Sequence, residues 1–153
     1  MKFEIEGPSL GKSAVCEPIL RDLPEWFGIE AAIVHYVAEI DILPTFLALH
    51  DGGALGFLSV KQHMHASAEL YVMAVCPDVH HQGVGRALVI AAQEWLKDRN
   101  VQYLQVKTLG PSHPDEGYAK TRLFYEAVGF VPLEEFTQLW DERNPCLILV
   151  KKI

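Results

Sequence analysis

Cysteine is scarce in this sequence, and the excess of basic residues that marks nucleic-acid-binding proteins is missing. The 153 residues include three cysteines, Cys16, Cys76 and Cys146, which are scattered and form no CxxC pair. A disulfide framework is therefore not expected, and a reducing compartment such as the cytoplasm is. Thirteen Lys and Arg stand against twenty Asp and Glu, which gives a net charge of −7. This balance argues against nucleic acid as a partner.

Long uninterrupted hydrophobic runs are also missing. The first six residues carry Glu4 and Glu6 where a secretory signal needs an apolar core. The most apolar long window, residues 29–49, is broken by acids and by Pro44, which excludes a membrane span. Hydrophobic residues still make up 50% of the chain, enough for a core. No linker rich in Gly and Ser divides the sequence, so we expect a single domain over residues 1–153, with no membrane partner.

Hydrophobic periodicity predicts an alternation of strands and helices. The last predicted helix is expected to turn Leu123, Phe124, Ala127 and Val128 inward. A strand–helix–strand unit inside an otherwise meandering sheet indicates a mixed α/β fold. Strands are predicted at 3–6, 45–50, 55–61, 68–76, 101–108, 131–139 and 146–152, and helices at 13–22, 29–40, 83–100 and 119–128.

The segment that points to chemistry lies where the apolar strand at 68–76 leads into the amphipathic helix at 83–100. Gly83 and Gly85 stand at the start of that helix, where main-chain N–H groups lack helical partners and the helix dipole favours an anion. Arg86 adds a full positive charge in the first turn. A diphosphate suits such a site. The segment is no Walker A loop, because no Gly-Lys-Ser/Thr follows, and it lacks the third glycine of a dinucleotide fingerprint.

Two segments carry a resemblance to a known family. The run His80-His81-Gln82-Gly83-Val84-Gly85 resembles the acetyl-CoA-binding motif Q/R-x-x-G-x-G/A of the GNAT superfamily N-acetyltransferases. His80 stands where the family usually has Gln or Arg. Downstream, residues 122–130 read RLFYEAVGF and are similar to the family's helix with a Tyr four residues before Gly-Phe. The two motifs, separated by a predicted strand, are far more specific together than either is alone.

The resemblance implies the GNAT fold, a central and mostly antiparallel sheet splayed between the strands at 69–76 and 101–108 and flanked by the predicted helices. It implies acetyl-CoA as cosubstrate and a direct transfer of the acetyl group to a primary amine of a small molecule or peptide. Pantetheine is expected to pair like an extra strand with the backbone near Met73, Ala74 and Val75, and the diphosphate to lie on the amides of residues 81–86. The expected cofactor contacts are Met73, Ala74, Val75, His80, His81, Gln82, Gly83, Val84, Gly85, Arg86, Tyr118 and Phe124, with Tyr118 standing where the family often has Asn.

The resemblance and the residue pattern together suggest two catalytic groups. Glu69 is the sole acid of the central strand, and strand alternation places it on one face with Tyr71 and Met73. Some family members use a strand glutamate at the matching position as the base, directly or through water. Tyr125 matches the family's acid, which protonates the leaving thiolate. Three histidines remain alternative bases: His63, His65 and His113.

The amine acceptor is expected near aromatic side chains of the early helices and the late strands. Candidates are Trp26, Phe27, Tyr71 and Trp140, with the polar segment 112–116 as a lid. The pair His63 and His65 lacks zinc-like companion ligands, so no metal is expected. Dimers are common in the family, so a homodimer is expected as an alternative to a monomer.

Three other readings of the sequence stay open. A thiol acyl-enzyme at Cys76 is disfavoured, because no fixed base accompanies it. A non-catalytic acyl-CoA-binding sensor is the main alternative to an enzyme, followed by an interaction domain with a vestigial cofactor cleft. Retention of both Glu69 and Tyr125 favours the enzyme.

Overall fold

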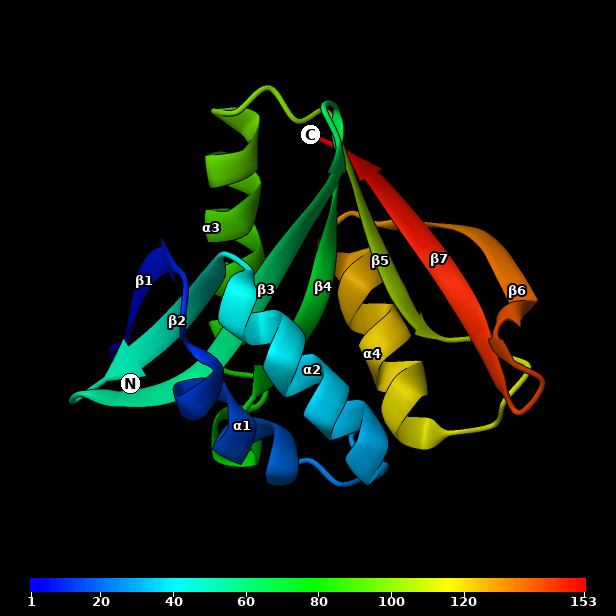
Figure 1. The fold of residues 1–153 in the computed structure, drawn as a ribbon, viewed down its shortest axis with the longest axis horizontal. Helices are drawn as coiled ribbons and strands as arrows, with labels where there is room; N and C mark the ends of the chain where they lie inside the picture. Colours follow the sequence, from blue (N-terminus) through cyan, green and yellow to red (C-terminus); the bar gives the residue numbers. More distant parts are fainter. The chain divides into compact units, whose positions relative to one another are not determined.

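The computed structural model describes residues 1–153 and contains seven strands and four α-helices (Figure 1). The elements follow the predicted order, with one short 3₁₀ helix, η1, that the periodicity did not indicate. Their bounds are β1 (Glu4–Ser9), α1 (Ser13–Arg21), α2 (Glu30–Ile42), β2 (Thr45–His50), β3 (Gly53–Met64), β4 (Ser67–Val75), η1 (Pro77–Val79), α3 (Val84–Lys97), β5 (Tyr103–Leu109), α4 (Glu116–Ala127), β6 (Val131–Asp141) and β7 (Asn144–Lys152).

The strands form one mixed sheet in the order β1-β2-β3-β4-β5-β7-β6. The pairs β1–β2, β2–β3, β5–β7 and β6–β7 are antiparallel. Strands β4 and β5 are parallel, with Ser67–Glu69 paired to Tyr103–Gln105, because α3 provides the crossover that parallel strands need. The chain divides into two compact units, residues 1–61 with 70–99 and residues 62–69 with 100–153.

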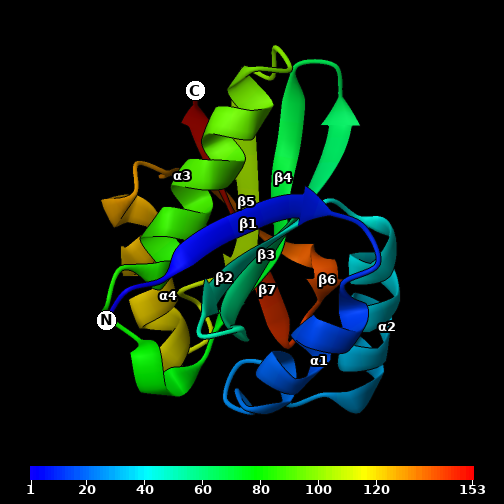
Figure 2. The ribbon, with the colours of Figure 1, turned by 90° about the vertical axis from the view of Figure 1, so that its left-hand side faces the viewer.

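The first unit has helices on both faces of its strands. On one face α1 and α2 pack over a core that includes Leu47 of β2 and Phe57 of β3. Phe46 precedes Leu47 and therefore points to the opposite face, where its ring meets Trp95 of α3 at 6.0 Å between centroids. Figure 2 shows α3 on one side of β1 and β2, with α1 and α2 on the other. The buried cluster consists of Cys16, Ile19, Leu20, Leu23, Ile40, Leu47, Phe57, Val72 and Ala74.

In the second unit, α4 packs against β5 and β6, and Tyr125 is its buried residue. Tyr125 is 7% exposed, and its ring meets those of Phe124 and Phe130 at 5.4 and 5.8 Å between centroids. The predicted inward face of this helix is wrong in part, since Leu123 is 65% exposed and Ala127 is exposed as well. A residue two positions from Tyr125 points to the opposite side of a helix with 3.6 residues per turn, so the burial of Tyr125 turns both outward.

The predicted fold class, a mixed sheet with four helices, is confirmed. None of the helices combines the length and the apolar character that a membrane crossing needs. Cys16, Cys76 and Cys146 are free thiols. The single domain, the homodimer and the cytoplasmic location stay predictions.

Candidate active site

The turn between β4 and α3 is shaped by two residues in left-handed conformation. His81 has φ +64° and Gly83 has φ +85°, and a side chain added at Gly83 would meet open space. Gly83 is therefore needed for its backbone conformation, since left-handed φ strains residues with a Cβ. His81, Gln82 and Gly83 are exposed, so the turn is accessible to a ligand.

Helix α3 begins at this turn with free donors. Its first helical hydrogen bond runs from the Ala87 N–H to the Gly83 carbonyl at 3.0 Å, and no side chain caps its start. The N–H groups of Val84, Gly85 and Arg86 thus have no acceptor within the helix. Together with the positive end of the helix dipole, they can bind an anion such as a diphosphate. The exposed Arg86 side chain lies in the same turn.

His80 fixes the start of the turn. Its Nε2 lies 2.8 Å from the Val75 carbonyl oxygen, and because a carbonyl only accepts, Nε2 carries the proton and donates. The ring also meets Trp26 edge-on at 6.1 Å between centroids. The ring of His80 therefore holds the turn against the end of β4. The cofactor contact of His80 stays a prediction.

The end of β4, which carries Met73, Ala74 and Val75, lies close to the backbone of β3. A Cβ on Gly56 would approach the Ala74 carbonyl oxygen to 3.0 Å and the Val75 Cγ2 to 3.2 Å. The Cys76 N–H donates to the Leu55 carbonyl at 2.7 Å. Gly56 therefore allows a close approach of the two strands where the predicted pantetheine-binding residues lie.

Glu69 is the centre of a charged cluster built from three strands. Its side chain is 4% exposed, and its Oε1 lies 2.7 Å from His63 Nε2 and 3.3 Å from Lys107 Nζ. His63 comes from the end of β3 and Lys107 from β5. The sequence pattern treated Glu69 and His63 as alternatives, whereas the structure joins them. Lys107 was not predicted, because only the parallel register of β4 and β5 brings it to Glu69.

Cys146 of β7 lies close enough to this cluster to respond to both of its charges. Burial raises the pKa of the Cys146 thiol to about 11, while Lys107 lowers this pKa and Glu69 raises it. The thiol therefore stays neutral at physiological pH and adds no charge. The two other candidate histidines lie elsewhere, His65 exposed at the β3–β4 turn and His113 in the loop before α4.

Three further predicted residues of the second unit, Tyr118, Phe124 and Tyr125, lie on α4. Asp115 caps this helix, and its Oδ1 accepts from the Tyr118 N–H at 3.0 Å. Tyr118 is therefore in the first turn of α4, half-buried, and Tyr125 is two turns further along. Phe124 is half-buried beside Tyr125. The local sequence thus places a buried tyrosine on a capped helix.

A family model matches the part of the chain that contains these residues. Residues 34–132, well over half of the chain, match the family model described as acetyltransferase (GNAT) domain. The chain belongs to the GNAT acetyltransferase family. The matched range includes the turn before α3, the Glu69 cluster and Tyr125.

Among curated proteins, a mycothiol acetyltransferase from Thermomonospora curvata is 32% identical over 85 residues. The match covers 56% of this chain and 27% of that protein, so the chain spans about a quarter of its relative's length. A mycothiol acetyltransferase from Stackebrandtia nassauensis is 27% identical over 126 residues, with 80% of this chain and 36% of that protein covered.

A solved structure supports the fold assignment. A GNAT-family protein from Desulfovibrio desulfuricans superposes with a TM-score of 0.86 at 18% identity, and 99% of each chain is covered. At this identity the likeness shows that the GNAT fold is shared.

The aromatic residues predicted for the acceptor site fall into two groups. Three of them belong to the first unit, where Phe27 and Tyr71 both meet Tyr36, each at 5.8 Å between ring centroids. Trp26 and Phe27 pack on the core beneath α1 and α2. Trp140 belongs to the second unit and is 44% exposed near the end of β6. Tyr36 was missed, although it lies on a helix whose spacing was recognised.

A lysine of this GNAT chain lies beside the aromatic residues of the first unit. Lys61 Nζ lies 5.2 Å from the centroid of the Tyr71 ring and 3.6 Å from Glu39 Oε1. The pair of charges makes this part of the first unit polar beside its aromatic rings. No sequence motif links these residues, because they come from α2, β3 and β4.

The segment proposed as a lid is tied to β6 at its start. Both the N–H and the hydroxyl of Ser112 donate to the carboxylate of Glu135, the N–H at 2.9 Å. These two hydrogen bonds lower the pKa of Glu135 below its usual range. A Cβ on Gly110 would collide with the same carboxylate. The proposed lid is thus anchored at Ser112. The sequence did not predict this contact, because Glu135 lies 23 positions further along the chain.

The thiol of Cys76 is poorly suited to covalent catalysis. Burial raises its pKa above the ordinary value, and the carboxylates of Asp22 and Asp78 raise it further. A thiol must ionise to act as a nucleophile, so this environment opposes an acyl-enzyme.

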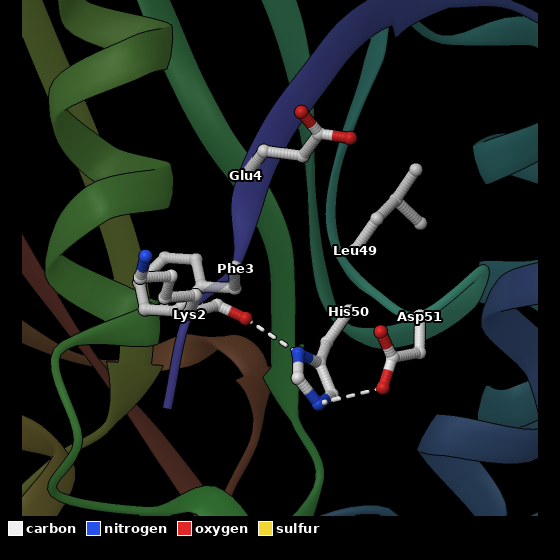
Figure 3. A pocket seen from close by; sticks show the side chains of 6 residues that line it. All are labelled: Lys2, Phe3, Glu4, Leu49, His50 and Asp51. Carbon is white, nitrogen blue, oxygen red and sulfur yellow. Dashed lines mark hydrogen bonds and ion pairs between the residues drawn. The ribbon is translucent and has the colours of Figure 1, made fainter.

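A separate depression lies where β1 and β2 pair. Its volume is about 550 Å³, and none of the predicted site residues lines it. Figure 3 shows the His50 ring between the Lys2 carbonyl and the Asp51 carboxylate, to which its Nε2 lies 3.3 Å away. Both ring nitrogens are thus engaged, and the depression is lined by Lys2, Phe3, Glu4, Leu49, His50 and Asp51.

Proposed function

We propose that this GNAT protein transfers the acetyl group of acetyl-CoA directly to a primary amine of a small molecule or peptide. The observation that carries the proposal is the turn before α3, where the left-handed Gly83 leads into an uncapped helix start. A related structure from Elizabethkingia anophelis, described with acetyl-CoA bound, superposes with a TM-score of 0.73 at 16% identity, and 99% of this chain and 98% of that one are covered.

The main chain of the turn binds the diphosphate of the cofactor. The N–H groups of Val84, Gly85 and Arg86 donate to its oxygens, and the Arg86 guanidinium adds a charge-assisted contact. Each charge–dipole contact contributes only about 0.3–1 kcal/mol, so several donors have to act together. The protein's net charge of −7 opposes an anion, which makes this local arrangement necessary.

The pantetheine arm runs beside the main chain of Met73, Ala74 and Val75. Extended chains pair with exposed strand backbone through regular hydrogen bonds. Phe124 and Tyr118 of α4 are the further cofactor contacts that the family motif suggests. His80 keeps the Val75 carbonyl engaged and thereby fixes where the strand ends and the turn begins.

The acceptor enters as an ammonium ion, whose pKa of about 10 makes it unreactive until a proton leaves. The Glu69 cluster removes that proton. The freed amine attacks the thioester carbon, and the bond from carbon to sulfur breaks as the tetrahedral intermediate collapses. Tyr125 gives a proton to the departing sulfur and regains one from the new amide nitrogen, so that one proton in total goes to water.

Acceptor selection falls to the aromatic residues. Trp26, Phe27 and Tyr71 offer apolar surface, and Trp140 is the corresponding candidate in the second unit. The name of the curated relatives, mycothiol acetyltransferase, suggests amines of small thiol compounds as the first acceptors to test.

Two measurements test this function. Acetyl-CoA at 100 times its Kd is expected to stabilise the protein by about 2.7 kcal/mol, which a thermal shift detects. A panel of amines, followed by thiol release and by mass spectrometry of the acetylated product, is expected to give turnover with at least one. Binding without turnover across the panel would show a sensor, and no thermal shift would contradict cofactor binding altogether.

A further inference from the structure

We infer that His63 is the group that takes the proton from the amine, and that Glu69 is a positioning residue acting through it. This inference rests on the proposed acetyl transfer and assigns the base within it. The expectation from the sequence was the reverse, with Glu69 as the base.

Exposure separates the two residues. The side chain of His63 is 32% exposed, whereas that of Glu69 is 4% exposed. A substrate nitrogen must come within hydrogen-bond distance of its base, directly or through one water. The carboxylate oxygen Oε1 of Glu69 is already occupied by two donors, His63 Nε2 at 2.7 Å and Lys107 Nζ at 3.3 Å. The imidazole is the accessible end of the pair.

The contact with Glu69 also fixes which nitrogen of His63 is basic. An ionised carboxylate only accepts hydrogen bonds, so Nε2 must carry the proton. In the neutral ring, Nδ1 then holds the lone pair. A carboxylate behind an imidazole orients the ring and stabilises the imidazolium that forms when Nδ1 takes a proton, as in Ser-His-Asp triads.

Lys107 moderates this arrangement. Its Nζ lies beside the same carboxylate oxygen as His63, so it offsets part of the negative charge of Glu69. The groups facing His63 are thus Glu69 from β4 and Lys107 from β5, while Cys146 of β7 stays a neutral thiol because burial raises its pKa to about 11.

The proton steps balance with this assignment. His63 Nδ1 takes one proton from the ammonium, and the nitrogen lone pair then forms the bond to the acetyl carbon. The imidazolium passes that proton to solvent. The second proton leaves the nitrogen when the carbon–sulfur bond breaks, and Tyr125 relays one proton to the sulfur. No oxidant or reductant takes part.

The test compares His63→Gln with His65→Gln, an exposed histidine two residues away. The His63 variant is expected to lose about 10²–10⁴ in kcat/KM and to lose the acidic limb of the pH–rate profile, while the His65 variant keeps both. Added imidazole is expected to restore activity to His63→Gly. Thermal shift with acetyl-CoA checks that the variants are folded and bind cofactor.

A His63→Gln enzyme with activity within about threefold of wild type and an unchanged acidic limb would overturn the inference, while wild-type turnover would leave the proposed function standing. Failure of wild type to acetylate any amine would overturn both.

A readout without turnover completes the test. In ¹H–¹⁵N spectra that resolve imidazole tautomers, the neutral ring of His63 is expected to carry its proton on Nε2, and Glu69→Gln is expected to disturb that preference. A neutral His63 with its proton on Nδ1 would contradict the assignment.

Discussion

The turn before α3 and the Glu69 cluster differ in the groups that they present. The turn presents main-chain N–H groups, and the cluster presents side chains. At the turn, the proposed donors to the diphosphate are mainly main-chain N–H groups of consecutive residues, and Arg86 is the one charged side chain among them. At the cluster, three side chains from β3, β4 and β5 meet around one carboxylate oxygen. In the proposed mechanism, cofactor binding therefore rests mainly on backbone shape, whereas proton transfer depends on side-chain identity.

This difference predicts how substitutions divide. Changes at the turn are expected to alter cofactor affinity, and changes of catalytic side chains in the second unit are expected to alter kcat. A substitution at the turn that changed only kcat, or a substitution of a catalytic side chain that changed only cofactor affinity, would contradict this comparison.

The largest effect is expected at Tyr125. Replacing it with Phe keeps the packing against Phe124 and Phe130 but removes the hydroxyl, so kcat is expected to fall by about 10²–10⁴ with acetyl-CoA affinity almost unchanged. Tyr103→Phe, at a 48% exposed tyrosine of β5, is the matched control. Steady-state kinetics with calorimetric binding gives both numbers, and an unchanged kcat would remove Tyr125 from the mechanism.

A smaller effect on affinity is expected from Gly83→Val. Valine in left-handed conformation is strained by about 1–2 kcal/mol, so the turn relaxes and must be restored on binding, which raises the Kd for acetyl-CoA by about 5–30-fold. Gly52→Val is the matched control, because Gly52 also has a positive φ, +78°, and open space around its Cβ. Equal Kd values for the two variants, measured by calorimetry, would refute the role of the turn.

Arg86→Gln tests the one charge at the turn. Loss of a contact of about 0.3–1 kcal/mol is expected to raise the Kd about 2–5-fold and to weaken its dependence on salt. The variant is not expected to lose stability, since a cation in the first turn opposes the helix dipole. Lys97→Gln, in the last turn of the same helix, serves as control. A Kd that stays at the wild-type value across salt concentrations would exclude a contact from Arg86.

The smallest effect concerns stability alone. The hydrogen bonds from Ser112 lower the pKa of Glu135, so the folded state binds this proton less readily than the unfolded state. The stabilisation is present above the ordinary carboxyl pKa of 4.5 and is lost as the pH falls through the lower folded value.

Glu135→Gln is therefore expected to lower Tm slightly at pH 7, with the difference from wild type vanishing in acid. Thermal melts across pH provide the measurement. A difference that stayed constant from neutral pH to acid would show that the carboxylate charge plays no part.

The predictable half of this protein is the part encoded by neighbouring residues. Periodicity predicted the order of strands and helices, and Gly83 with the amphipathic pattern after it predicted the turn that leads into an uncapped helix start. Alternation along one strand singled out Glu69. Each of these signals acts within a few residues of the chain.

The remainder depends on register between distant segments. Lys107 joins Glu69 only because β5 pairs in parallel with β4. Glu135 accepts hydrogen bonds from Ser112, 23 positions away. His80 donates to the Val75 carbonyl at the end of β4, a contact that its position in the motif did not predict. The wrongly predicted burial of Leu123 has a similar origin, since the packing of Tyr125 decides which side of α4 faces inward.

The most direct test of the account is a crystal structure of the protein with acetyl-CoA. We expect the diphosphate within hydrogen-bond distance of the N–H groups of Val84, Gly85 and Arg86, with Gly83 still in its left-handed conformation. A cofactor whose diphosphate lies against any other part of the protein, with these N–H groups left to water, would contradict it.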